Sequence, residues 1–471
     1  MNYIEAIDDP EVFGKWFAGE SWRNWRVVEK AIFGLEIGEA ELPLFRELTG
    51  RSDPPTEQAS EVWVIAGRRT AKSRKAATIA TYLATIGAEV MGYRDSLAPG
   101  ERGVVLVMAV SKQQANIVLD YSRALFRAIP MFNRLVERDT PEGLELRNGM
   151  ALTVLPNDFR VIRGRTLAAA ILDECAFWRN DLTRRPDTET YRAAKPALAT
   201  VPGSLLIGIS SAYRRAGLLW QKFKRHWGQP GNVLIVKAPT AVLNPLIDRE
   251  LIEQELEDDP EAARAEWLSE FRNDLSDFVR REVVEGLVSP GVHERPPMRA
   301  ARYQAFVDPS GGSNDAFTLG ISHREGEVAV LDVLRERRPP FSPEAVVEEF
   351  SGVLHSYGLG QVVGDRYGGE WPAEQFKKRG VWYRPSELPK SQIYLECLPL
   401  LNGARVDLLD DDRMVNQICS LERRTARGGK DSVDHPPHAH DDLANAALGA
   451  AWLAAGKAAM PGLVQQRLHG L

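Results

Sequence analysis

EVWVIAGRRTAKS, residues 61–73, joins an apolar run to a polar, basic turn. The apolar residues 61–66 predict a buried β-strand, and the residues from 72 to about 86 have the pattern of a helix. The residues between them therefore lie at a helix N-terminus, where unpaired N–H groups and the positive end of the helix dipole favour a bound phosphate. The segment predicts a phosphate-binding loop in an α/β sheet.

The loop residues have roles that follow from phosphate chemistry. Lys72 is expected to reach the terminal phosphates of a nucleotide, and Ser73 to bind Mg²⁺. Alanine replaces both glycines of the usual pattern GxxxxGK[ST], at Ala66 and Ala71, so that Gly67 is the one residue left with full backbone freedom. The alternative is a basic helix start on a solvated face. The predicted cofactor-binding residues are Gly67, Arg68, Arg69, Thr70, Ala71, Lys72, Ser73 and, from the next motif, Asp173.

A second motif lies about a hundred residues further on, where the apolar run 167–172 ends in Asp173 and Glu174. At the tip of a buried strand, Asp173 can hold the hydration shell of Mg²⁺, and Glu174 can polarise an attacking water. The next predicted strand, 205–209, runs into Ser210-Ser211, whose hydroxyls could sense a terminal phosphate. An acidic pair on the surface and a serine-rich turn are the structural alternatives.

Outward from these motifs, short apolar runs alternate with amphipathic stretches, as in a parallel α/β sheet. Residues 103–110 predict a strand, 112–128 a helix, and 144–155 a hairpin that turns at Asn148-Gly149. A charged, helix-rich stretch covers residues 244–274. Prolines and glycines then make residues 276–299 the best linker candidate.

A second α/β unit is predicted from Arg302 onward. Three successive strands (303–307, 316–322 and 328–335) precede a helix (343–357) and a further strand (361–364), and an alanine-rich helix closes the unit at 441–455. This order of elements matches an RNase H-like fold.

Carboxylates stand at the ends of these elements. Asp308 and Asp365 each follow a predicted strand, and Asp441-Asp442 opens the last helix. Such closely spaced carboxylates repel one another unless divalent cations lie between them, and paired cations can activate water and stabilise the leaving oxygen of a phosphodiester. Asp441 is the preferred third ligand, with Asp442 as its close alternative. The structural alternative is a set of acids that cap turns and helices.

Composition narrows the class of protein. The chain has 471 residues and a formal net charge of −6, so DNA binding would need local basic stripes. Candidate stripes are Arg214, Arg215, Lys222, Lys224 and Arg225, and Arg423, Arg424, Arg427 and Lys430. The 3 cysteines form no zinc or disulfide pattern, and His435, His438 and His440 are spaced poorly for zinc. No signal segment or membrane span is predicted, so export is not expected, and the scattered cysteines favour a reducing cytoplasm.

Taken in order, these motifs resemble the large subunits of phage and viral terminases over residues of about 20 to 455. The resemblance includes Arg68-Arg69 before the lysine, Arg163-Gly164 before the acidic strand, and Asn244-Pro245 before an acidic helix. It also includes His440-Asp441-Asp442 with its alanine-rich continuation. By the resemblance, adenine would contact the region of Trp22, Trp25 and Arg26, and Lys390 would lie near the carboxylates.

The resemblance implies four segments. Residues 1–238 would form a P-loop ATPase core of the ASCE/RecA-like type, and 239–299 a helical subdomain and linker. Residues 300–456 would form an RNase H-like nuclease, and 457–471 a flexible tail. The implied cofactors are ATP with Mg²⁺ at the first site, and two Mg²⁺ or Mn²⁺ ions at the second. The implied catalytic residues are Glu174, Asp308, Asp365 and Asp441, and the implied metal ligands are Ser73, Asp173, Asp308, Asp365, Asp441 and Asp442.

The resemblance further implies a motor in the host cytoplasm that drives double-stranded DNA into a procapsid and cuts concatemeric DNA. Its partners would be a portal protein, a small terminase subunit and further copies in a pentameric ring, with a monomer in free solution as the other possibility. A trans-acting arginine would complete each ATP site. The alternatives are an ATP-dependent translocase and nuclease of repair or restriction, or a capsid-docking scaffold with an inactive ATP site.

Overall fold

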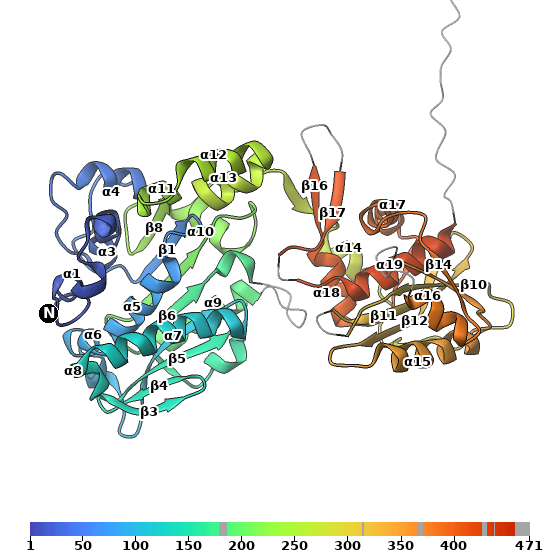
Figure 1. Cartoon of the computed structure of the whole chain (residues 1–471), viewed down its shortest axis with the longest axis horizontal. Coiled ribbons are helices and arrows are strands. Elements are labelled where there is room, and N and C mark those ends of the chain that lie inside the picture. Colours follow the sequence, from blue (N-terminus) through green and yellow to red (C-terminus); the bar gives the residue numbers. More distant parts are fainter. Residues whose placement is uncertain (179–185, 313–314, 366–370, 426–430, 438, 457–471) are drawn as a thin grey trace, which may run out of the picture. The chain divides into compact units, whose positions relative to one another are not determined.

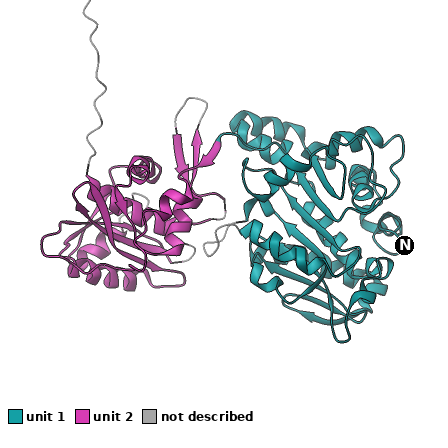
Figure 2. Ribbon diagram, turned by 180° about the vertical axis from the view of Figure 1, so that it is seen from behind, with its two compact units in different colours: residues 1–180, 185–274 teal, residues 181–184, 275–471 magenta. Residues whose placement is uncertain are grey.

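The computed structural model describes residues 1–178, 186–312, 315–365, 371–425, 431–437 and 439–456. These residues form two compact units, and the boundary along the sequence lies between Asp274 and Leu275 (Figures 1 and 2). Each unit combines a β-sheet with helices, so the predicted α/β class with two units is confirmed. The predicted tail, 457–471, lies outside the described residues.

The first unit contains an eight-stranded sheet with the order β3-β4-β5-β2-β6-β7-β1-β8. Strands β5, β2, β6, β7, β1 and β8 are parallel, and β3 and β4 extend the sheet as antiparallel strands. The bounds are β1 Glu61–Ala66, β2 Gly103–Ala109, β3 Val136–Thr140, β4 Gly143–Leu146, β5 Met150–Pro156, β6 Thr166–Asp173, β7 Leu205–Ser210 and β8 Val233–Ala238. Strand β7 lies between β1 and β6, so the predicted phosphate loop and acidic pair leave the same edge of the sheet one strand apart.

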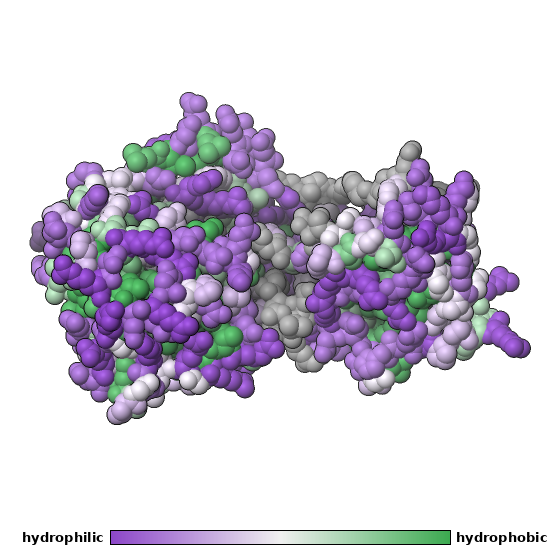
Figure 3. All heavy atoms as spheres, turned by 60° about the horizontal axis from the view of Figure 1, so that its bottom comes forward, coloured by the Kyte–Doolittle hydropathy of each residue, from purple (hydrophilic) through white to green (hydrophobic). Residues whose placement is uncertain are grey.

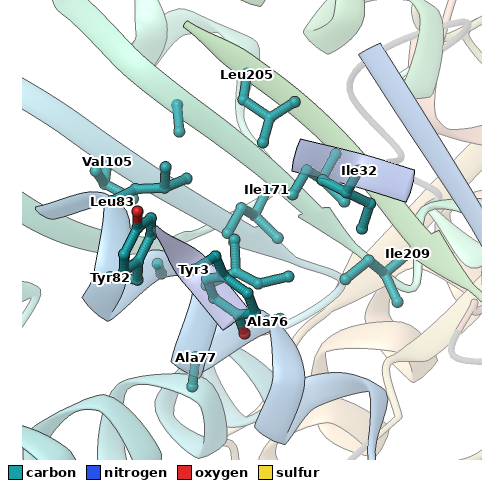
Figure 4. Close-up of a cluster of buried hydrophobic side chains, with 14 of the residues drawn as sticks. Tyr3, Ile32, Ala76, Ala77, Tyr82, Leu83, Val105, Ile171, Leu205 and Ile209 are labelled. Carbon is teal, nitrogen blue, oxygen red and sulfur yellow. The ribbon is translucent and has the colours of Figure 1, made fainter. Parts of the chain in front are cut away.

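Helices cover this sheet on both faces, which explains why its central strands are apolar throughout. One face packs against side chains of α1, α3, α5 and α7, among them Tyr3, Ile32, Ala76 and Leu83 (Figure 4). The other packs against α9 and α10. The helices are α1 Tyr3–Asp8, α2 Gly14–Phe17, α3 Arg23–Phe33, α4 Leu42–Thr49, α5 Lys72–Ala84, α6 Ile86–Val90, α7 Lys112–Ala128, α8 Pro130–Asn133, α9 Pro186–Leu198, α10 Gly217–His226, α11 Thr240–Leu243, α12 Arg249–Asp258 and α13 Pro260–Leu268.

The second unit contains a six-stranded sheet with the order β14-β13-β10-β11-β12-β15. Strands β10, β11 and β12 are antiparallel neighbours, whereas β13 runs parallel to β10. The predicted order of three strands, a helix and a returning strand is therefore confirmed. The bounds are β10 Tyr303–Asp308, β11 Phe317–Glu325, β12 Val328–Arg337, α15 Pro343–Ser356, β13 Gln361–Gly364, α16 Trp371–Lys378, β14 Trp382–Pro385, α17 Lys390–Asn402, β15 Val406–Asp407, α18 Asp412–Ser420 and α19 Asp442–Ala455.

The alanine-rich helix α19 packs closely on this sheet because glycines remove the Cβ atoms at two crossing points. A Cβ at Gly320 would lie 2.3 Å from the carbonyl oxygen of Ala446, and one at Gly449 would lie 2.4 Å from the ring of Phe306. Small residues on both surfaces thus let the N-terminus of α19 reach the end of β10. This contact positions the carboxylates discussed below.

The segment predicted as a linker has a different role in the structure. Strand β9 (Leu275–Asp277) pairs with β16 (Glu422–Thr425), which in turn pairs with β17 (Asp431–Asp434). Helix α14 (Arg281–Glu285) follows β9 in the chain. Phe278, Val284 and Leu287 are buried in the core of the second unit. Residues 275–299 therefore belong to the second unit and residues 239–274 to the first. Prolines and glycines predict a linker, but the apolar side chains between them are packed.

The surface drawn in Figure 3 is mainly hydrophilic, with apolar residues in small separate patches. Among the described residues, no helix is both long enough and apolar enough to cross a membrane.

Candidate nucleotide and metal sites

The loop between β1 and α5 follows a path that its sequence only partly predicts. Its left-handed residues are Arg69 and Ala71, with φ of 60° and 65°, and Ala71 occupies a position where the usual pattern has glycine. Gly67 has no positive φ, so the loop does not use the backbone freedom of this glycine. Gly67 is needed for space, because a Cβ there would lie 2.1 Å from Oγ1 of Thr240 and 2.9 Å from the carbonyl oxygen of Trp267.

Lys72 begins α5 and is buried, with 7% of its surface exposed. Its Nζ donates hydrogen bonds to the carbonyl oxygens of Ala66 (2.9 Å) and Gly67 (3.0 Å) and to Oγ of Ser211 (2.9 Å). It also lies 3.5 Å from Oε1 of Glu174. The ammonium group is thus held between the loop and the ends of β6 and β7, where it can exchange these contacts for phosphate oxygens.

Ser73 and Asp173 meet as the sequence predicts. The Ser73 hydroxyl donates to Oδ2 of Asp173 at 3.2 Å, although the two residues are 100 positions apart. Burial, together with the nearby charge of Glu174, raises the pKa of Asp173 to about 7. Its buried Oδ1 makes no hydrogen bond within the described part of the chain. A hydroxyl beside an underused carboxylate is a suitable oxygen donor set for Mg²⁺.

Glu174 lies directly after β6 in a left-handed conformation, with φ of 50°. Its Oε2 accepts hydrogen bonds from Oγ of Ser210 (3.1 Å) and from the backbone N–H of Ser211 (3.2 Å). The carboxylate is therefore fixed by the end of β7 and, through its other oxygen, faces Lys72. The serines predicted to sense a terminal phosphate thus contact the residue predicted to polarise water.

Two of the three residues suggested for adenine contact, Trp25 and Arg26, are engaged elsewhere. Trp25 is 1% exposed and donates from Nε1 to the carbonyl oxygen of Thr70 at 2.8 Å. Arg26 bonds to Asp8 and to the carbonyl oxygen of Phe17. Trp25 therefore supports the phosphate loop through its hydrogen bond to Thr70, and its buried ring is not available to stack on a base.

The carboxylates of the second unit gather around the N-terminus of α19. Asp308 ends β10, and its Oδ2 accepts a hydrogen bond from the amide of Asn445 on α19 at 2.8 Å. Burial, together with the charges of Asp442, Asp441 and Asp365, raises the pKa of Asp308 to about 8, although the hydrogen bond from Asn445 lowers it. Three of the four acids predicted from the sequence are thus close enough to Asp308 for their charges to raise its pKa.

Asp441 and Asp442 differ in their surroundings although they are adjacent. Asp441 is 4% exposed, and Nζ of Lys390 lies 3.2 Å from its Oδ1 and 3.0 Å from its Oδ2. The Tyr394 hydroxyl donates to Oδ2 at 2.8 Å. Asp442 is partly exposed, and its Oδ2 accepts from the backbone N–H of Ala316 at 3.1 Å. Both oxygens of Asp441 are therefore engaged by charged or polar side chains, unlike those of Asp442.

The chemistry of this donor set suits Mg²⁺ or Mn²⁺, which prefer carboxylate oxygens. Within the described ranges, however, no three His, Cys, Asp or Glu side chains are grouped closely enough to enclose a metal ion. The acids are near one another but do not form a closed cage. His440 lies 3.4 Å from Asp315 and His435 lies 3.9 Å from Asp434, whereas His438 is outside the described residues.

One residue in each of the two predicted basic stripes forms an ion pair with an acidic side chain. Lys222 lies 2.5 Å from the buried carboxylate of Glu61 and is only 14% exposed, so it neutralises an internal charge. Arg423 pairs with Asp431 across the β16–β17 hairpin. Arg427 and Lys430 lie outside the described residues.

The chain is similar in architecture to solved large terminases of bacteriophages. The large terminase of bacteriophage HK97 aligns over 92% of this chain and 99% of its own, with 16% identity and a TM-score of 0.37. The ATPase domain of the large terminase of Thermus phage P74-26 aligns over 51% and 96%, with 17% identity and a TM-score of 0.35. The large terminase nuclease of thermophilic phage G20c aligns over 36% and 95%, with 16% identity and a TM-score of 0.32.

No protein-family model and no curated protein matches the chain. Similarity at these identities and TM-scores assigns no activity to the chain.

Several site residues are not predicted from the sequence. Asn445 orients Asp308, and Tyr394 and Lys390 hold Asp441, but only Lys390 is suggested by the resemblance. Asn445 and Tyr394 do carry a signal, because each is a polar residue on the apolar face of a helix. Gln417 is a further case, since its buried Oε1 accepts from the first free N–H groups of α19, those of Leu443 and Ala444.

Proposed function

We propose that the chain is the large subunit of a phage terminase, an ATP-driven motor that packages double-stranded DNA and cuts it with a metal-dependent nuclease. The observation that carries the proposal is the meeting of Lys72, Ser73 and Asp173 across β1 and β6, with Glu174 fixed beside them. A lysine, a hydroxyl and two carboxylates in this arrangement are the parts that phosphoryl transfer to water requires. The second set of acids, in a separate α/β unit, supports a second hydrolytic site.

In the first unit, the loop residues 67–73 would bind the phosphates of ATP, and Ser73 and Asp173 would hold the accompanying Mg²⁺, which neutralises charge on the phosphates. Lys72 would leave the carbonyl oxygens of Ala66 and Gly67 and contact the terminal phosphate. Glu174 would then be released from Lys72 and accept a proton from the attacking water. Ser210 and Ser211, which hold Glu174, connect that carboxylate to β7.

In the second unit, Asp308, Asp365, Asp441 and Asp442 would bind two Mg²⁺ or Mn²⁺ ions, which supply an activated water and stabilise the leaving oxygen. The hydrogen bonds favour Asp442 over Asp441 as the third direct ligand. Asp441 is held on both oxygens by Lys390 and Tyr394, whereas Asp442 has one backbone contact on one oxygen. Asn445 would keep Asp308 in the orientation that faces the ions.

The proposed substrates and partners are ATP, double-stranded DNA, a portal protein, a small terminase subunit and further copies in a pentameric ring, in the host cytoplasm. The order of the motifs along the chain and the pairing of an ATP site with a nuclease site support this packaging role. A translocase of repair or restriction would use the same two chemistries without a portal. A docking scaffold would hydrolyse no ATP.

The test measures DNA-stimulated ATP hydrolysis and Mn²⁺-dependent plasmid cleavage in the same preparations. Lys72→Ala should abolish hydrolysis and leave cleavage intact, and Asp365→Ala should do the reverse. Wild-type protein without ATPase activity would support the scaffold. Cleavage that persists in Asp365→Ala would show that the nuclease site is misassigned. Binding to a portal protein encoded beside this chain would separate the packaging role from a repair translocase.

A further inference from the structure

The phosphate loop is held from outside at three consecutive carbonyl groups. The hydroxyl of Thr240 donates to the carbonyl oxygen of Arg68 at 2.9 Å, and the amide of Asn244 donates to that of Arg69 at 2.8 Å. The indole N–H of Trp25 donates to that of Thr70 at 2.8 Å. The three donors come from α3 and from the segment that begins with α11, so two separate elements hold the loop. These three hydrogen bonds, from Trp25, Thr240 and Asn244, are called the grip below.

These contacts are built into the core of the unit. Trp25 is 1% exposed and Thr240 is fully buried, so neither donor can exchange its contact for water without a local opening. The amide of Asn24, next to Trp25, donates to the carbonyl oxygen of Val242 at 2.6 Å. The two gripping elements are thus joined to each other and act as one support.

The three hydrogen bonds include one of the loop's two left-handed residues, Arg69, and end at the peptide group directly before the other, Ala71. Arg69 and Ala71 are left-handed, a conformation that is less favourable than the right-handed one for a residue with a Cβ. Glycine at position 71 would adopt it without that penalty. Since this loop has alanine there, some other interaction must offset the penalty and prevent the loop from relaxing.

We propose that Trp25, Thr240 and Asn244 are positioning residues that hold the nucleotide loop in its phosphate-accepting path, in place of the glycine that such loops normally use. By fixing the carbonyl groups of residues 68–70 on the outer side, they leave the loop's inner side to the phosphates. The inference rests on the proposed ATP site but adds to it a structural requirement. It predicts that removing one donor weakens nucleotide binding although no donor contacts the nucleotide.

The test compares full-length Trp25→Phe, which keeps a buried ring and removes only the indole N–H, with Trp63→Phe. Trp63 is an equally buried tryptophan near the start of β1, away from the loop, and its N–H bonds to Glu61. The dissociation constants of ATP and ADP should rise about tenfold in Trp25→Phe, the equivalent of one net hydrogen bond, and stay unchanged in Trp63→Phe. Plasmid cleavage should be unaffected in both.

Two further variants keep the test decisive. Thr240→Val, which removes a hydroxyl at nearly constant volume, should weaken binding as Trp25→Phe does. Adding Ala71→Gly to Trp25→Phe should restore most of the affinity, because glycine removes the backbone penalty that the grip offsets. Unchanged affinity in both single variants, equal losses in Trp25→Phe and Trp63→Phe, or no rescue by Ala71→Gly would overturn the inference. Wild-type protein that binds no nucleotide would instead overturn the proposed ATP site.

Discussion

The two candidate sites balance their charges in opposite ways. At the phosphate loop, the carboxylate of Glu174 faces the ammonium group of Lys72 at 3.5 Å, so the chain supplies its own positive charge. At the α19 site, Asp308 is paired with a neutral amide and lies in the field of three other acids, which raise its pKa beyond the effect of burial. In the second site Lys390 balances the charge of Asp441, but Asp308 pairs with the neutral amide of Asn445, so we expect divalent cations to stabilise the second site more than the first.

The largest expected effect is that of Glu174→Gln. Glutamine keeps an oxygen for the Ser210 and Ser211 contacts but cannot accept the proton of the attacking water. ATP hydrolysis should therefore fall at least about 100-fold while ATP binding persists. Steady-state hydrolysis and equilibrium nucleotide binding measure the two effects. Glu253→Gln, an exposed glutamate on α12, is the matched control and should retain full activity. Hydrolysis close to wild type in Glu174→Gln would remove this residue from catalysis.

Asp308→Asn should separate the sites most clearly. The amide keeps an acceptor for Asn445 but removes one buried charge, so DNA cleavage should fall about 100-fold or more while ATP hydrolysis persists. Without divalent cations, and at a pH above about 8 where Asp308 is ionised, the variant should melt at a higher temperature than wild type, because repulsion among the acids is reduced. Mn²⁺ should raise the melting temperature of the wild type and have little effect on the variant. A similar Mn²⁺ shift in both proteins would contradict the metal site at Asp308.

Glu61→Gln should destabilise the fold, in contrast to Asp308→Asn, because the carboxylate of Glu61 has positively charged partners. Burial alone would raise the pKa of Glu61. Hydrogen bonds from Lys222, Lys195 and Trp63 outweigh burial and lower this pKa from 4.5 to about 2. A carboxylate whose pKa is lower in the folded than in the unfolded state stabilises the fold at pH values above its unfolded pKa, here about 4.5. This stability is lost as the pH falls from about 4.5 towards 2. The variant should lose roughly 3 kcal/mol at neutral pH.

Thermal unfolding of both proteins at several pH values measures this loss. The difference between wild type and Glu61→Gln should shrink as the pH is lowered below about 4.5. A difference that does not change with pH would mean that Glu61 stabilises the fold by packing alone.

The smallest effect is expected for Ala71→Gly on its own. Glycine removes the penalty of the left-handed backbone but adds freedom to the free loop, and the two changes oppose each other. Nucleotide affinity should change by less than about threefold. Calorimetric titration with ADP measures it. A tenfold loss would mean that the Cβ of Ala71 makes a contact of its own, and the comparison of the two sites would then need a second preorganising element in the loop.

Most of the fold could be predicted from the sequence because strands and helices leave periodic, local patterns. The strand 61–66, the loop after it and the acids at the ends of 167–172 and 303–307 are all evident for this reason. Residues 276–299 are the main exception. Their prolines and glycines predict a linker, yet Phe278 and Val284 are buried in the second unit. Burial against distant elements leaves no mark in a local pattern.

By itself, the sequence determined which chemical groups stand at the edge of each sheet, since the ends of buried strands and the residue types that follow them are local properties. Only the tertiary structure decided which side chains hold those groups. The Trp25 contact to the loop spans 45 positions, and the Asn445 contact to Asp308 spans 137. Such contacts depend on how helices pack against the sheets, and no spacing along the chain encodes them. The same packing distinguishes Asp441, engaged by Lys390 and Tyr394, from its neighbour Asp442.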